Sequence, residues 1–114
     1  MNHTMGLYDD PFEKIIARTK LIEIRLWDDK RRRLKVGDTI TFTKLPNPSE
    51  QATVRVIALD LFPTFRDLYE TLPPQILGAN GESVDYLVQS TYDTYTPEQE
   101  KEFGAVAIHI ELLD

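Results

Sequence analysis

The stretch that decides the expected fold is Arg18-Thr19-Lys20-Leu21-Ile22-Glu23-Ile24-Arg25-Leu26. Its apolar side chains recur at every second position from Ile22 onward, which is the period of a β-strand. Glu23 and Arg25 then project from the opposite face, about 7 Å apart. Lys20 stands at the entrance of the strand, so one carboxylate lies between two cations. Such a group is either a structural ion pair that closes a barrel or a site that offers a donor to a ligand phosphate or carbonyl.

The rest of the chain adds more strands and several short helices. Alternating residues predict strands at 21–26, 39–43, 53–59 and 105–112, with a weak one at 4–7. Helix starts are predicted at Asp10, Thr64 and Thr96, which can cap, and a further helix is predicted at 83–92. The residues after Pro73 and those at 78–81 are expected to be turns or loops. About five strands with short helices indicate an α+β fold or a small barrel core, which periodicity does not separate.

Composition indicates one soluble domain spanning residues 1–114. Hydrophobic residues make up 41% of the 114 residues, which is ordinary for a globular protein. The chain has no cysteine, so disulfides, thiolate catalysis and cysteine-bound metals are excluded. It has no apolar run long enough for a membrane span and no signal-peptide pattern, so a cytoplasmic location is expected.

Charge is divided unevenly along the chain. The net charge is −6, yet residues 14–35 carry nine basic and three acidic residues. Within them, Lys30-Arg31-Arg32-Arg33 is either a solvated turn or part of a positive surface for an anionic ligand. The acidic remainder restricts such a ligand to a short one and argues against coating a long duplex.

Standard catalytic motifs are missing from the sequence. It contains no Gly-rich phosphate loop, no nucleophile elbow, no dinucleotide fingerprint and no paired-histidine zinc motif. We therefore predict no metal and no cofactor. His109 alternates outward from the last predicted strand, which favours a surface or edge role.

Several of these features together resemble the ASCH domain family, which has a PUA-like β-barrel. The family motif reads Gly-x-Lys-x-x-Glu-x-Arg, and Lys20, Glu23 and Arg25 match three of its four marked positions. The likeness extends over nearly the whole chain, through Lys30-Arg31, Gly37-Asp38, Phe42, Phe65-Arg66-Asp67-Leu68-Tyr69, Tyr95, Glu100 and Gly104-Ala105-Val106-Ala107-Ile108. It implies a small barrel of about five to six strands with short peripheral helices. Arg18 stands where the family usually has Gly, so the turn there is expected either to differ or to add a cation at the mouth of the site.

The resemblance implies a cleft on the barrel that binds RNA or a nucleotide-like ligand. The expected partner is a short single-stranded RNA, a nucleotide or a modified nucleoside, with no membrane. The residues expected to contact it are Lys20, Glu23, Arg25, Trp27, Lys30, Arg31 and Tyr95. The cations would bind phosphates, and Trp27 or Tyr95 would stack on a base. Trp27 is equally expected as a cap on the edge of the barrel.

Two other functions stay open at the level of sequence. One branch with this fold is similar to an amidohydrolase of acylated (N4-acetyl) cytidines, in which the lysine matching Lys20 is catalytic. That branch has a threonine where this chain has Glu23, which could instead act as a base toward water, and a later glutamate that corresponds to Glu82 or Glu70. A third reading is a protein partner bound by the acidic helices at 65–71 and 96–103.

Overall fold

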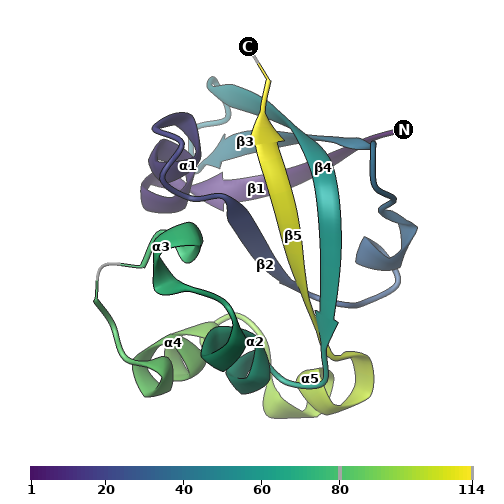
Figure 1. Cartoon of the computed structure of the whole chain (residues 1–114). Coiled ribbons are helices and arrows are strands. Elements are labelled where there is room, and N and C mark those ends of the chain that lie inside the picture. Colours follow the sequence, from purple (N-terminus) through teal and green to yellow (C-terminus); the bar gives the residue numbers. More distant parts are fainter. Residues whose placement is uncertain (80, 114) are drawn as a thin grey trace.

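One curled five-stranded sheet forms the centre of the computed structural model, which describes residues 1–79 and 81–113. Its strands are β1 (Asn2–Tyr8), β2 (Ile22–Leu26), β3 (Thr39–Leu45), β4 (Gln51–Phe62) and β5 (Ala105–Leu112). Their order is β1-β3-β4-β5-β2, with β1 parallel to β3 and each other neighbouring pair antiparallel. The sheet is a half-barrel whose two edges are β1 and β2 (Figure 1). The predicted α+β fold with a small barrel is confirmed.

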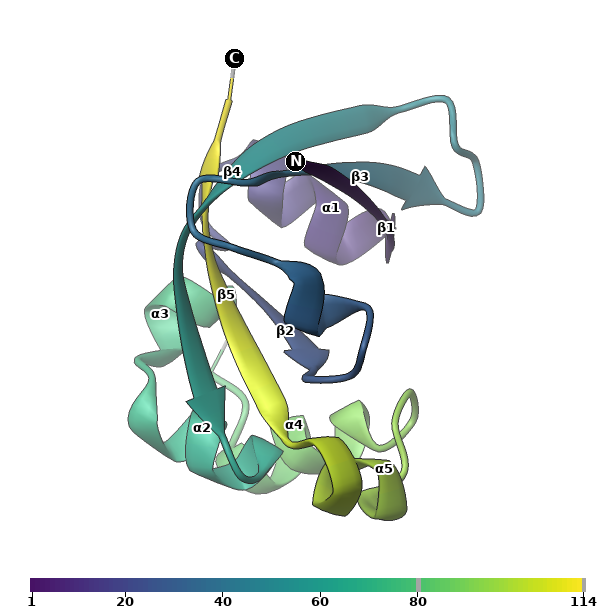
Figure 2. The same cartoon turned by 90° about the vertical axis from the view of Figure 1, so that its right-hand side faces the viewer.

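The long strand β4 bends the sheet. Its first half pairs with β3, and from Val54 onward it pairs with β5. The register with β5 shifts between Val56 and Ala58, which leaves Ile57 as an extra residue on β4. Such a bulge bends a strand and increases its twist. Figure 2 shows β4 running from its pairing with β3 to the far end of β5.

Two apolar clusters pack against the sheet. The first lies under α1 (Asp9–Ile16) and joins Phe12 and Ile15 to buried side chains of β3 and β4. The second joins Ile22 and Leu26 of β2 to Phe65 and other residues of the helical side. That side consists of α2 (Phe65–Thr71), α3 (Pro74–Leu77), α4 (Val84–Thr91) and α5 (Pro97–Phe103). Strand β2 therefore buries its alternating apolar face against the helices, as predicted, and turns Glu23 and Arg25 the other way.

Two of the predicted helix starts are confirmed and one is wrong. The Thr64 side chain accepts a hydrogen bond from the Asp67 amide, and Thr96 forms a capping box with Gln99. In contrast, α1 begins at Asp9 without a side-chain cap, so Asp10 lies within the first turn. Carboxylates in that turn favour the positive end of the helix dipole without capping it.

Other elements differ from the prediction in their extent. Strands β1 and β4 are longer than the segments 4–7 and 53–59, because sheet pairing continues past the alternating residues. Helix α3 was not predicted: α2 ends at Thr71, just before the two prolines, and Pro74 then occupies the first turn of a new helix. The charged loop contains a short 3₁₀ helix, η1 (Arg31–Arg33). The loop predicted at 78–81 includes Asn80, which lies outside the described residues.

Arg18 keeps a left-handed backbone conformation, with φ 62°. Its amide donates to the Ile15 carbonyl, and the next two amides both donate to the Lys14 carbonyl. Its guanidinium reaches toward the Leu112 carbonyl at 3.4 Å. The turn is therefore one that suits glycine, although arginine occupies it.

Candidate ligand-binding site

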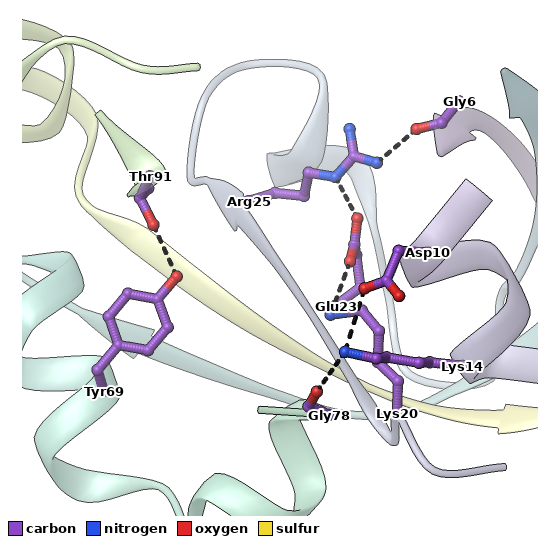
Figure 3. A network of polar contacts seen from close by, with 9 residues as sticks. All are labelled: Gly6, Asp10, Lys14, Lys20, Glu23, Arg25, Tyr69, Gly78 and Thr91. Carbon is purple, nitrogen blue, oxygen red and sulfur yellow. Dashed lines mark hydrogen bonds and ion pairs between the residues drawn. The ribbon is translucent and has the colours of Figure 1, made fainter. Parts of the chain in front are cut away.

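Glu23 is a buried carboxylate held between two cations. The Lys20 Nζ lies 3.4 Å from its Oε1, and the Arg25 Nε donates to its Oε2 at 2.7 Å. Only 5% of Glu23 is exposed, and its two partners are largely buried as well. Figure 3 shows the three side chains converging beside β2. The sequence pattern thus predicted a cluster that the structure brings together.

The two cations keep this carboxylate ionised despite its burial. Burial by itself acts to raise the pKa of Glu23, but the charges of Lys20 and Arg25 outweigh it and lower the pKa below its usual value. Burial likewise acts to lower the pKa of Arg25, but Glu23 and then Tyr95 raise it. The Glu23 carboxylate is therefore ionised at neutral pH, in a cluster with one more basic side chain than acidic ones.

Arg25 also bridges the two edges of the sheet. Its Nη2 donates to the Gly6 carbonyl of β1 at 3.0 Å (Figure 3). Between these edges lies a cavity of about 370 Å³, here named the edge cavity. Its walls are Gly6, Leu7, Tyr8, Pro11, Glu23, Ile24, Arg25, Tyr69, Thr91, Thr94 and Tyr95. Glu23 and Arg25 thus line a hollow, as a ligand-binding cluster requires.

Lys20 faces a second hollow, here named the helix cavity, of about 250 Å³ between α1, α3 and α4. Lys14 lies in its wall, donates to the Gly78 carbonyl at 2.8 Å and pairs with Asp10 at 3.1 Å. Glu82 also lines this cavity. Of the two later carboxylates considered from sequence, Glu82 therefore shares a cavity with Lys20, whereas Glu70 is exposed on α2 and lines neither cavity.

Tyr95 lies in the edge cavity, as expected of a ligand contact. Its ring stacks on that of Phe65, with centroids 5.8 Å apart and planes 9° from parallel. Phe65 is fully buried at the start of α2. The Tyr95 ring is therefore supported from behind while it lines the cavity.

The other predicted contacts lie outside both cavities. Trp27 packs against the first apolar cluster, and the Arg32 guanidinium lies 5.6 Å from its ring centroid. Arg31 pairs with Asp28 at 2.9 Å, and Lys30 is exposed. This packing agrees with the expected capping role of Trp27, and its base-stacking role stays a prediction. Ligand contacts by Lys30 and Arg31 stay predictions.

The sequence did not single out Tyr69 and Thr91. The Tyr69 hydroxyl lies 2.7 Å from the Thr91 Oγ1, and the Thr91 hydroxyl donates to the Leu87 carbonyl. In the sequence, Tyr69 is the last residue of the stretch 65–69 that resembles the family. A buried phenol needs a polar partner, so a tyrosine on the packed side of a helix was the sequence signal that could have pointed to this pair.

A second buried carboxylate, Glu100 on α5, lies apart from these cavities. Its Oε2 accepts from the Phe65 amide and its Oε1 accepts from the Tyr92 hydroxyl, each at 2.7 Å. These bonds join α5 to the start of α2 and to the end of α4. Glu100 was one of the residues that resemble the ASCH family, and its role in helix packing explains why a glutamate is needed there.

Residues 1–79 and 81–113 contain no group of three or more His, Asp or Glu side chains that could hold a metal ion. Within the same residues, no helix is long and apolar enough to cross a membrane.

Comparison with known proteins gives one consistent family. The ASCH domain model matches residues 5–114. The crystal structure of hypothetical protein PH0355 is 33% identical, with a TM-score of 0.89 over 99% of this chain and 100% of that one. The solution structure of protein PF0455 from Pyrococcus furiosus is 36% identical, with a TM-score of 0.73 over 100% of this chain and 99% of that one. ASCH from Zymomonas mobilis is 13% identical and shares the fold, with a TM-score of 0.63 over 96% of this chain and 66% of that one. No curated protein matches.

Proposed function

The chain belongs to the ASCH domain family, and from that premise we propose that it binds a short single-stranded RNA, a nucleotide or a modified nucleoside, with one base in the edge cavity. ASCH domains are generally proposed to bind RNA. The observation that carries the proposal is the buried Glu23 cluster, which lines a hollow between two free sheet edges.

The cavity offers the hydrogen-bonding groups that a base edge requires. Arg25 has five N–H donors; Nε donates to Glu23, one on Nη2 donates to Gly6, and Tyr95 is a further side-chain partner, so donors remain for a base edge. The outer sides of β1 and β2 also carry backbone amides and carbonyls that the sheet does not pair. Bases are read by such donors and acceptors when they are unstacked from a strand.

Size and aromatic lining support a single base. A volume of about 370 Å³ is at the small end of the range for ligand pockets. Tyr95, backed by Phe65, provides a ring on which a base can stack. In this proposal the exposed basic residues around η1, including Lys30, bind the phosphates of flanking nucleotides.

The ionised state of Glu23 favours binding over amide hydrolysis. A general base works best with a pKa near the working pH, whereas the pKa of Glu23 is lowered. Both of its oxygens also contact cations. Incubation with N4-acetylcytidine, followed by mass spectrometry, tests the hydrolase alternative: we expect no loss of the acetyl group, and turnover would replace the binding proposal.

A pair of neighbouring substitutions tests the proposed cavity. Thr94 and Asp93 are both exposed, and Thr94 lines the edge cavity whereas Asp93 does not. We expect Thr94→Trp to weaken binding of a fluorescein-labelled RNA of about eight nucleotides by about tenfold, and Asp93→Trp to leave it unchanged. Fluorescence anisotropy measures both. Equal affinities for the two variants, or a wild type that binds neither RNA nor nucleotides, would contradict the proposal.

The basic residues are tested by a second matched pair. Lys30→Glu is expected to weaken RNA binding and to make its salt dependence less steep, by about one unit of slope for a lost phosphate contact. Lys101→Glu, an equal charge change at an exposed position on α5, is the control. Equal losses in both variants would indicate only a general effect of net charge.

A further inference from the structure

Tyr69 lies where the edge cavity and the helix cavity meet. Three residues, Pro11, Ile24 and Tyr69, line both cavities. Pro11 belongs to α1, Ile24 to β2 and Tyr69 to α2, so three separate elements form this boundary. Figure 3 shows the Tyr69 ring extending from α2 toward Thr91, on the helical side of β2.

The hydroxyl of Tyr69 is fixed in direction. Because the single Thr91 hydroxyl proton goes to the Leu87 carbonyl, Tyr69 must donate its own proton to Thr91. This bond joins α2 to α4 and holds the ring in place. Burial raises the pKa of Tyr69, and the charge of Glu23 raises it further, so the phenol stays a neutral donor.

The ion cluster crosses the same boundary. Glu23 lines the edge cavity and Lys20 lines the helix cavity, yet their charged groups lie 3.4 Å apart. A substituent that extends from a base beside Glu23 toward Lys20 would therefore meet the boundary residues. Of these three, Tyr69 has the largest side chain.

We propose that Tyr69 is a specificity-determining residue that limits the ligand of the edge cavity to a base without a bulky substituent. This inference rests on the proposed function, because it concerns the ligand of the same cavity. Truncation of the ring would join hollows of about 370 and 250 Å³, so the helix cavity would receive the substituent.

The test compares two nucleosides with their bulky derivatives. The probes are cytidine and adenosine, with N4-benzylcytidine and N6-benzyladenosine, whose amine linkages cannot be removed by amide hydrolysis. We expect the wild type to bind at least one parent nucleoside and to bind its benzyl derivative about tenfold more weakly or worse. Tyr69→Ala is expected to remove this preference, whereas Tyr69→Phe, which keeps the ring and loses only the hydroxyl, is expected to retain it.

Calorimetric titration gives the affinities, and thermal unfolding shows which variants are folded. If Tyr69→Ala does not fold, Tyr69→Leu replaces it and is expected to relax the preference in part. An unchanged preference in a folded truncation variant, or a wild type that binds the benzyl derivative as tightly as its parent, overturns this inference alone. A wild type that binds neither parent nucleoside also overturns this inference, whereas the proposed function is overturned only if the labelled RNA and nucleotides fail to bind as well.

Discussion

The two buried carboxylates of this protein have opposite surroundings. Glu100 is surrounded by neutral donors, an amide and a phenol, and joins two helices. Glu23 is surrounded by two cations and lines a cavity. Both are almost fully buried, at 7% and 5% exposure. Burial of a carboxylate is therefore not in itself a sign of a ligand site.

Glu100 and Glu23 differ in the charge of the groups that bind their carboxylates. Neutral donors complete the hydrogen bonds of Glu100 without adding charge, which suits a packing contact between helices. Two cations around Glu23 introduce three buried charges, an arrangement that costs desolvation energy and contributes little stability compared with apolar packing. A fold that keeps such a group beside a hollow is expected to use it for binding.

Removal of Glu23 should have the largest effect on stability. Glu23→Ala leaves the charges of Lys20 and Arg25 buried without their partner, so we expect a loss of about 3–5 kcal/mol of unfolding free energy in urea titrations. A triple variant with Lys20→Met, Glu23→Leu and Arg25→Met should recover most of this loss. If it does not, unpaired charge is not the cause.

Removal of Glu100 should cost less. Glu100→Ala leaves the buried Phe65 amide without an acceptor, so a loss of about 1–3 kcal/mol is expected by the same measurement. Glu100→Gln keeps one acceptor oxygen and should lose less than that. A loss as large as that of Glu23→Ala would remove the distinction between the two carboxylates.

The acid dependence of stability should identify Glu23. Because folding lowers its pKa below the usual 4.5, the unfolded chain takes up the proton first as the pH falls. The stabilising contribution is full above that value and is lost as the pH drops through the pKa of the folded state. We therefore expect the wild type to lose more unfolding free energy than Glu23→Gln between about pH 7 and about pH 3. Parallel curves for the two proteins would contradict the lowered pKa.

The smallest expected effect concerns the turn that leads into the cluster. At position 18 the left-handed conformation favours glycine over any residue with a side chain. Arg18→Gly should therefore be more stable than Arg18→Ala by about 1 kcal/mol, and both should bind ligand like the wild type, since Arg18 lines neither cavity of the proposed site. Thermal unfolding of the pair measures this difference. Equal stabilities would show that the turn does not hold this conformation.

Local pattern predicted the cluster but not its surroundings. Strand alternation placed Glu23 and Arg25 on one face, and the position before the strand placed Lys20 beside them. The cavity depends on β1 pairing in parallel with β3, far along the chain, and on α2 and α4 meeting through Tyr69 and Thr91. Contacts between such distant segments leave no periodic signal in the sequence. The contacts of Arg31 with Asp28 and of Arg32 with the Trp27 carbonyl are local, by contrast, but a run of like charges does not by itself indicate which of its members pair.

The hydrogen bond from Arg25 to Gly6 has a consequence for the solubility of the protein. An open sheet normally leaves two rows of backbone groups available to strands of other molecules, which promotes aggregation. Here that bond ties the two outer strands to each other across the cavity, so the Arg25 side chain occupies the space between the two edges. An added strand would have to displace this bond and approach the charges of Arg25 and Glu23.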